Sequence, residues 1–142
     1  MIPEDFINTA ERLLKDTTEE ADKRSAISRS YYGAFHASIK SLPPKFAPAT
    51  ADLNGNASHK AVVDALAQWG GSLDSGRTEA QQASRTLATL KKARRRADYD
   101  IDDELDAADL SSCVRNARSV LTRVELARSQ YEKSTAAIVK EA

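Results

Sequence analysis

The sequence predicts an all-α protein, a compact antiparallel bundle of four to five helices. Three observations lead to this fold class. Apolar residues recur at spacings of three and four along most of the chain. No stretch alternates apolar and polar residues over a useful length, as a half-buried strand would. The 142 residues include 5 Gly and 4 Pro, whereas Ala, Leu and charged residues, which favour helices, dominate.

The amino-terminal part of the chain predicts two helices. The first covers residues 3–15, because Pro3 suits the first turn of a helix and apolar residues follow it at helical spacing. The second begins with the segment 17–20, which is typical of a capping box. This helix is expected to end before the proline pair at 43–44, because proline cannot continue a helix. An exposed loop over residues 43–57 follows.

Three more helices are expected after this loop. Ser58 is placed to cap the third helix, and the glycine pair at 70–71 is expected to close it. The fourth helix covers about residues 75–99. An acidic connector leads to the fifth helix, which starts near Asp106 or Asp109.

We expect one domain, a helical bundle over residues 1–133, with residues 134–142 as a C-terminal tail that frays. No apolar run is long enough to span a membrane, and the first residues lack the basic and apolar regions of a signal peptide. The single cysteine, Cys113, excludes an internal disulfide and a cysteine-based metal site. The expected protein is therefore cytoplasmic, with no membrane partner, no metal and no other cofactor.

The charge of the chain is balanced overall and uneven locally. Its 21 Lys and Arg residues match its 21 Asp and Glu residues. This balance argues against a protein held on nucleic acid by overall charge alone. A basic run over residues 91–96 is followed at once by an acidic stretch over residues 98–109. The basic run is most simply a solvated helix end that complements the helix dipole.

The second helix has two unusual surfaces beside its core face. The core face is apolar apart from one serine and comprises Ile27, Tyr31, Ala34, Phe35, Ser38, Ile39 and Leu42. The outer face combines aromatic, titratable and cationic side chains, namely Ser25, Arg29, Tyr32, His36 and Lys40. A flank of small residues separates these two faces and comprises Ala26, Ser30, Gly33 and Ala37. The flank predicts a close approach by another helix, and the outer face predicts a second contact surface.

Arg94 lies on the inward stripe of the fourth helix. Four apolar residues lead up to it at spacings of three and four, namely Ala80, Ala83, Leu87 and Leu90. A buried guanidinium without a partner is costly. Arg94 is therefore either a structural residue that pairs with a carboxylate or caps carbonyls, or a residue that binds phosphate, whose oxygens suit its planar fork.

Three other residues are candidates for the same site. Tyr99 could donate a hydrogen bond or stack on a base, or it is a structural tyrosine with a satisfied hydroxyl. His36 lies on the outer face of the second helix, where a role in a site or an interface fits its neighbours. His59 lies in the first turn of its helix, where a solvated side chain is expected. Two histidines without a well-placed acidic ligand predict no metal site.

Two segments carry a pattern that is specific in combination. The first is RSAISRSYYGAFH at residues 24–36, followed by the pair 58–59 at the start of a helix. The second is LKKARRRADYD at residues 90–100. Together these segments resemble the HEPN superfamily, and most closely its prokaryotic branch with an Arg-x-x-Ala-Asp-Tyr ending. The resemblance covers about residues 5–130.

The resemblance implies a bundle of four to five helices that usually forms a homodimer, often paired with a small nucleotidyltransferase as antitoxin. Many members are RNA-cleaving toxins of toxin–antitoxin or defence systems. Their metal-independent site, formed between two subunits, uses an Arg and a His separated by four to six residues. Arg94 matches that Arg, but the corresponding positions for the His hold Tyr99, Asp100 and Ile101.

The sequence therefore predicts a HEPN-like helical protein of a toxin–antitoxin or defence type, without the usual catalytic His. It would be a dimer that binds RNA, a nucleotide or a nucleotidyltransferase partner. The alternative is a metal-independent ribonuclease toxin. Its candidate catalytic residues are Arg94, Tyr99 and His36, and the candidate binding residues are Arg29, Tyr32, Arg95 and Arg96. A purely structural bundle is the third hypothesis, favoured if Arg94 is ion-paired inside the monomer.

Overall fold

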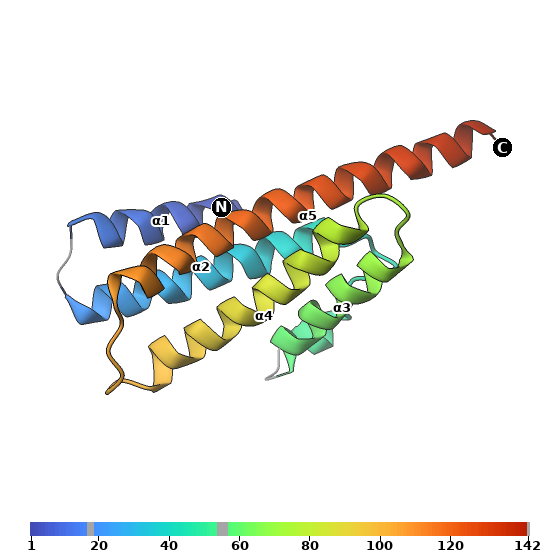
Figure 1. Cartoon of the computed structure of the whole chain (residues 1–142). Helices are drawn as coiled ribbons and strands as arrows, with labels where there is room; N and C mark the ends of the chain where they lie inside the picture. The colour runs from blue at the N-terminus through green and yellow to red at the C-terminus, as the bar shows by residue number, and fades with distance from the viewer. Residues whose placement is uncertain (17–18, 54–56, 142) are drawn as a thin grey trace.

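A computed structural model describes residues 1–16, 19–53 and 57–141, and within them it contains helices and no strand (Figure 1). The described α-helices are α1 (Pro3–Asp16), α2 (Glu20–Ser41), α3 (Ser58–Ser72), α4 (Arg77–Tyr99) and α5 (Ala107–Glu141), with a short 3-10 turn, η1 (Thr50–Leu53), before α3. The predicted all-α bundle is confirmed.

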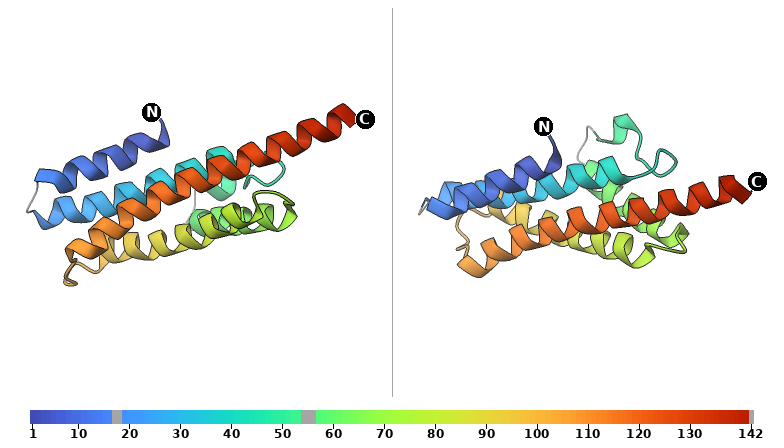
Figure 2. Two further views of the ribbon diagram at one scale, coloured as in Figure 1. Left: turned by 45° about the horizontal axis from the view of Figure 1, so that its top comes forward. Right: turned by 90° about the horizontal axis from the view of Figure 1, so that it is seen from above.

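Helix α2 lies at the centre of the bundle, because it packs against each of the other four α-helices. The chain reverses direction between α1 and α2 and again between α4 and α5, so these sequence neighbours are antiparallel (Figures 1 and 2). Helix α3 packs mainly against α4. This arrangement brings the start of α3 and the second half of α4 to the same side of α2.

The core is one continuous cluster of buried side chains from all five α-helices. Its largest fully buried members include Ile7 of α1, Tyr31 of α2, Trp69 of α3, Leu87 of α4 and Val120 of α5. The expected core face of α2 is confirmed, with the difference that Ile39 is only partly buried.

The small flank of α2 is where α1 approaches, as predicted. Ala26, Ser30, Gly33 and Ala37 are all buried. A Cβ built on Gly33 would lie 2.8 Å from Cγ1 of Ile7 and 3.0 Å from the carbonyl oxygen of Pro3. The glycine therefore sets how closely the two helices pack.

Several helix ends differ from the sequence expectation. Ser58 is the first residue of α3, with Ala57 at the cap, and the helix runs past the glycine pair at 70–71 to Ser72. The chain turns instead at Gly76, whose φ of 88° is in the left-handed region that favours glycine. Helix α4 consequently begins at Arg77 rather than near residue 75. Residue 17 of the expected capping box lies outside the described residues.

The C-terminal residues differ from the expected frayed tail, since α5 continues as helix to Glu141. The reason is local, because residues 107–141 contain neither Gly nor Pro to interrupt the backbone hydrogen bonds. Side chains from residue 132 to residue 139 are exposed. In both views of Figure 2 the end of α5 projects beyond the other helices.

The acidic connector between α4 and α5 is held by two arginines. Arg24 of α2 donates to five backbone carbonyls at the end of α4 and in the connector, those of Arg96, Ala97, Asp100, Ile101 and Asp103. Arg96 forms ion pairs with Asp103 and Asp109 and donates to the carbonyl oxygen of Glu104.

Among the described helices, none is long and apolar enough to cross a membrane.

Candidate functional site

Arg94 is buried, as its place on the inward stripe of α4 predicts, and only 8% of its surface is exposed. Its guanidinium carbon lies 5.5 Å from the centre of the Tyr31 ring on α2. Its Nη1 is 3.4 Å from Oδ2 of Asp98, one turn later on the same helix. The Nε of Arg94 is buried and has no hydrogen-bond partner in the described part of the chain. The ion pair with Asp98 inside the chain favours the structural hypothesis, whereas the unpartnered Nε leaves the hydrogen-bonding capacity of the guanidinium incompletely satisfied.

An imidazole from a different helix belongs to the same group of side chains as Arg94. The hydroxyl of Tyr31 forms a hydrogen bond with Nδ1 of His59, in the first turn of α3. The Tyr31 ring is fully buried, whereas His59 is partly exposed. Arg94, Tyr31 and His59 therefore form one cluster, called here the Arg94–His59 site, with the imidazole at its solvent side.

The charges around this site act on both titratable rings. Burial lowers the pKa of His59 below its usual 6.5, and the positive charges of Arg94, Lys91 and Arg95 lower it further. Burial strongly raises the pKa of Tyr31, and the nearby Arg94 opposes that rise. At neutral pH the site therefore holds a neutral imidazole, a protonated phenol and several cations, a combination that attracts an anion.

A row of rings connects the Arg94–His59 site to the outer face of α2. The ring centres of Tyr32 and His59 are 6.4 Å apart, as are those of Tyr32 and His36. His36 stacks on Phe6 of α1 at 5.3 Å, with 16° between the ring planes. The guanidinium carbon of Arg29 lies 6.0 Å from the centre of the Phe6 ring. We call Phe6, Arg29, Tyr32 and His36 the outer aromatic surface.

The structure thus brings together four of the candidate residues, Arg94, Tyr32, His36 and Arg29, in one row. Arg95 is exposed on α4, close enough for its charge to act on His59. Arg96 is occupied by the connector instead. Tyr99 is 69% exposed at the end of α4, unlike the buried Arg94.

Sequence reasoning missed the roles of two residues. Tyr31 was assigned to the core, which is correct, but its hydroxyl also reaches the site. His59 was expected to be a solvated side chain; it is partly exposed, and its Nδ1 also hydrogen-bonds to the Tyr31 hydroxyl. The signal that could have found His59 is its place directly after Ser58 at a helix start, within the pattern that resembles the HEPN superfamily.

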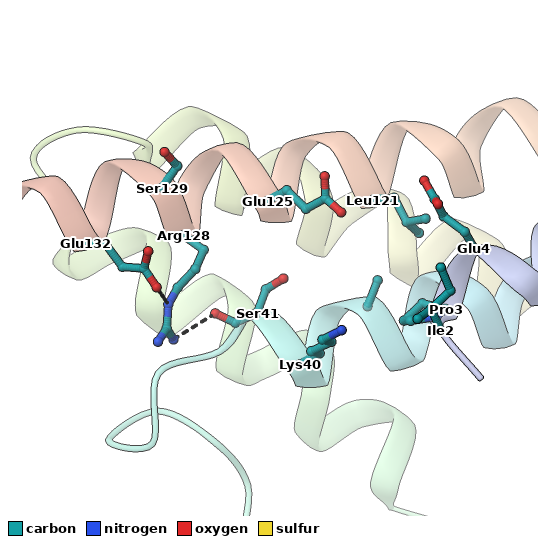
Figure 3. Close-up of a pocket in the computed structure, with 11 residues that line it drawn as sticks. Ile2, Pro3, Glu4, Lys40, Ser41, Leu121, Glu125, Arg128, Ser129 and Glu132 are labelled. Carbon is teal, nitrogen blue, oxygen red and sulfur yellow. Dashed lines mark hydrogen bonds and ion pairs between the residues drawn. The ribbon is translucent and has the colours of Figure 1, made fainter.

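A groove lies apart from the Arg94–His59 site. This groove of about 410 Å³ lies between the start of α1, the end of α2 and the middle of α5 (Figure 3). Its main cation, Arg128, is already engaged, since it pairs with Glu132 at 2.9 Å and donates to the carbonyl oxygen of Ser41 at 3.3 Å. The rest of the lining includes a second cation, Lys40, together with hydroxyl, apolar and acidic residues such as Ser129, Leu121 and Glu125. The groove is thus chemically mixed, without the concentrated positive charge of the Arg94–His59 site.

Comparison with family models, with curated proteins and with solved structures found no match to this chain. The geometry of the described residues therefore carries the functional argument.

Proposed function

We propose that this protein is a HEPN-like helical protein of a toxin–antitoxin or defence type that binds RNA, with one phosphate group at the Arg94–His59 site. The observation that carries this proposal is the buried guanidinium of Arg94, whose Nε has no partner in the described structure. Its single ion pair, with the partly exposed Asp98, is long at 3.4 Å. A phosphate group would add a closer negative charge, and its oxygens would accept hydrogen bonds from the guanidinium and the imidazole.

The outer aromatic surface favours RNA over a free inorganic anion. Bases stack on aromatic rings and on arginine, at about 1–3 kcal/mol per base. Tyr32 and His36 offer such rings next to the phosphate position, and Arg29 adds a cation at the far end. A single strand with its phosphate at Arg94 could therefore lay a neighbouring base on this surface.

The first test measures the affinity of a short single-stranded RNA by fluorescence anisotropy. Arg94→Gln removes the charge but keeps a polar side chain. Losing a hydrogen bond to a charged group costs about 1.5–3 kcal/mol, so we expect a roughly 10- to 100-fold weaker affinity. Arg85→Gln is the matched control, because Arg85 is exposed on the same helix and lies nine residues earlier, on the opposite face.

Circular dichroism of the three proteins verifies that the variants remain folded. Arg94→Lys adds a second check, since lysine keeps the positive charge and loses the planar fork. The proposal is wrong if the wild-type protein does not bind RNA, or if Arg94→Gln and Arg85→Gln bind it equally well.

A second candidate function, metal-independent RNA cleavage, is favoured by the position of His59 beside Arg94. Cleavage requires the attacking 2′-oxygen to lose a proton and the leaving 5′-oxygen to gain one, and a positioned imidazole typically contributes about 10²–10⁴-fold to such steps. His59, which hydrogen-bonds to Tyr31 and feels the charge of Arg94, supports this candidate better than the exposed Tyr99 does. Incubation of labelled RNA with the protein in EDTA distinguishes the two functions. Cleavage that disappears in His59→Gln supports the ribonuclease, and intact RNA supports binding alone.

We further propose, from the sequence resemblance, that the active form is a homodimer and that a small nucleotidyltransferase is its partner. Light scattering during size-exclusion chromatography gives the mass of the wild-type protein. A mass close to twice 15.5 kDa supports the dimer, and a monomer at all concentrations contradicts it.

A further inference from the structure

The Tyr31 hydroxyl has an unusually restricted environment. Its ring is fully buried, and in the described chain its hydroxyl has one hydrogen-bond partner, Nδ1 of His59. Burial raises the pKa of this phenol, so the hydroxyl keeps its proton at neutral pH. Buried donors are almost always satisfied, because an unmade hydrogen bond costs about 1–3 kcal/mol.

Two arrangements of protons are consistent with this contact, and they differ in cost. If Nδ1 of His59 carries the proton, it donates to the Tyr31 oxygen, and the Tyr31 proton then needs a second acceptor. The described residues provide none. If Tyr31 donates to Nδ1, both groups are satisfied, and the proton of the neutral imidazole lies on Nε2.

We propose that Tyr31 is a positioning residue that holds neutral His59 in the form protonated at Nε2, which offers an N–H donor to a phosphate oxygen bound at Arg94. The phosphate part of this inference rests on the proposed function, whereas the proton position does not. The ring of Tyr31 packs against the guanidinium of Arg94, and its hydroxyl orients the imidazole of His59. One side chain therefore aligns both anion-binding groups.

The surrounding charges support the neutral form. The positive charges of Arg94, Lys91 and Arg95 of α4 act on the imidazole, and the rings of Tyr31 and Tyr32 of α2 lie beside it. Protonation at Nδ1 would also convert the Tyr31 oxygen into an acceptor and leave its own buried proton without a partner. In the resting site Nε2 is therefore a donor and not a base, which favours binding of RNA over abstraction of its 2′-hydroxyl proton.

The proton position can be read directly by NMR. Long-range ¹H–¹⁵N correlations of a histidine side chain show which ring nitrogen carries the proton. The chain has two histidines, and a His36→Gln variant assigns their signals. We expect His59 at neutral pH to be almost entirely protonated at Nε2, whereas in Tyr31→Phe it becomes a mixture of the two forms. Phenylalanine keeps the buried ring under Arg94, and the exposed His36 is the internal control.

Affinity for RNA tests the phosphate part separately. The amide nitrogen of glutamine reaches about as far as Nε2, while that of asparagine reaches only as far as Nδ1. We expect His59→Asn to bind RNA roughly tenfold more weakly than His59→Gln, the value of one neutral hydrogen bond.

The two parts fail in distinguishable ways. Protonation of His59 at Nδ1 in the wild type, or an Nε2 signal unchanged in Tyr31→Phe, overturns the positioning role of Tyr31 whatever the RNA result. Equal RNA affinity of the wild type, His59→Gln and His59→Asn overturns the phosphate contact, even if the NMR result is as expected.

Discussion

At the scale of single residues, the protein holds a guanidinium in its interior with little compensation. Removing one partner of a buried ion pair commonly costs about 3–5 kcal/mol, which shows how expensive an isolated buried charge is. Arg94 reduces this cost with the face of Tyr31 and one long ion pair with Asp98. A purely structural arginine would be expected to have its nitrogens satisfied, as Arg24 does with five carbonyls. The contrast between the two arginines points to a ligand at Arg94.

The lowered pKa of His59 makes stability depend on pH. In the unfolded chain this pKa returns to about 6.5, so between the lowered value and 6.5 the unfolded state binds more protons than the folded state. The contribution of His59 to stability is therefore complete above 6.5 and is lost as the pH falls through the folded-state pKa. We expect urea unfolding midpoints at about pH 7.5 and about pH 5.5 to differ more for the wild type than for His59→Gln. An equal pH dependence of the two proteins would contradict this role of His59.

The sequence located Arg94 but not its neighbours, and the reason is physical. Apolar residues at helical spacing show which face of a helix is buried. Periodicity alone therefore identified Arg94 and the outer face of α2. The contact between Tyr31 and His59 joins residues 28 positions apart, and it depends on how α3 is oriented against α2 and α4. Periodicity contains no information about that orientation.

At the scale of helices, close packing of α1 on α2 depends on the small flank of α2. Ridges of one helix fit into grooves of another only where side chains permit the approach. Gly33 faces Ile7 and the backbone of Pro3 at distances that leave no room for a methyl group. The sequence predicted this flank correctly, because small residues at helical spacing are visible without a structure. It did not predict the helix ends near Gly76, because a left-handed turn and a helical glycine look alike in sequence.

The flank gives a prediction with a matched control. In Gly33→Ala the new methyl group forces α1 to shift, and such overpacking costs about 1–3 kcal/mol, which outweighs the better helix propensity of alanine. Gly71→Ala is the control, because no atom lies within 4 Å of the added Cβ. We expect the free energy of unfolding to fall in Gly33→Ala and to rise by about 0.5–1 kcal/mol in Gly71→Ala, as measured by urea titration. Equal effects of the two changes would show that α1 does not pack as described.

At the scale of the whole molecule, the end of α5 differs from the bundle because its side chains are exposed. Up to Tyr131, α5 contributes to the core, and Tyr131 itself packs edge-on against Trp69 with ring centres 6.2 Å apart. From residue 132 to residue 139 the side chains are exposed, and two of them are the large apolar Ile138 and Val139. Side-chain burial therefore stops after Tyr131, although the helix continues to Glu141.

Two truncations test whether the projecting part of α5 contributes to the monomer. A chain that ends after residue 133 loses only exposed side chains among the described residues, and we expect its free energy of unfolding to stay within about 0.5 kcal/mol of the wild type. A chain that ends after Ala127 also loses the Tyr131 contact with Trp69 and the bond from Arg128 to Ser41, and it should be clearly less stable. Fluorescence of Trp69, the single tryptophan, reports unfolding in both. A loss of more than about 1 kcal/mol in the longer chain would mean that the projecting helix is covered in solution. If that loss grows with protein concentration, the cover is a second copy of the chain, because only association makes stability depend on concentration.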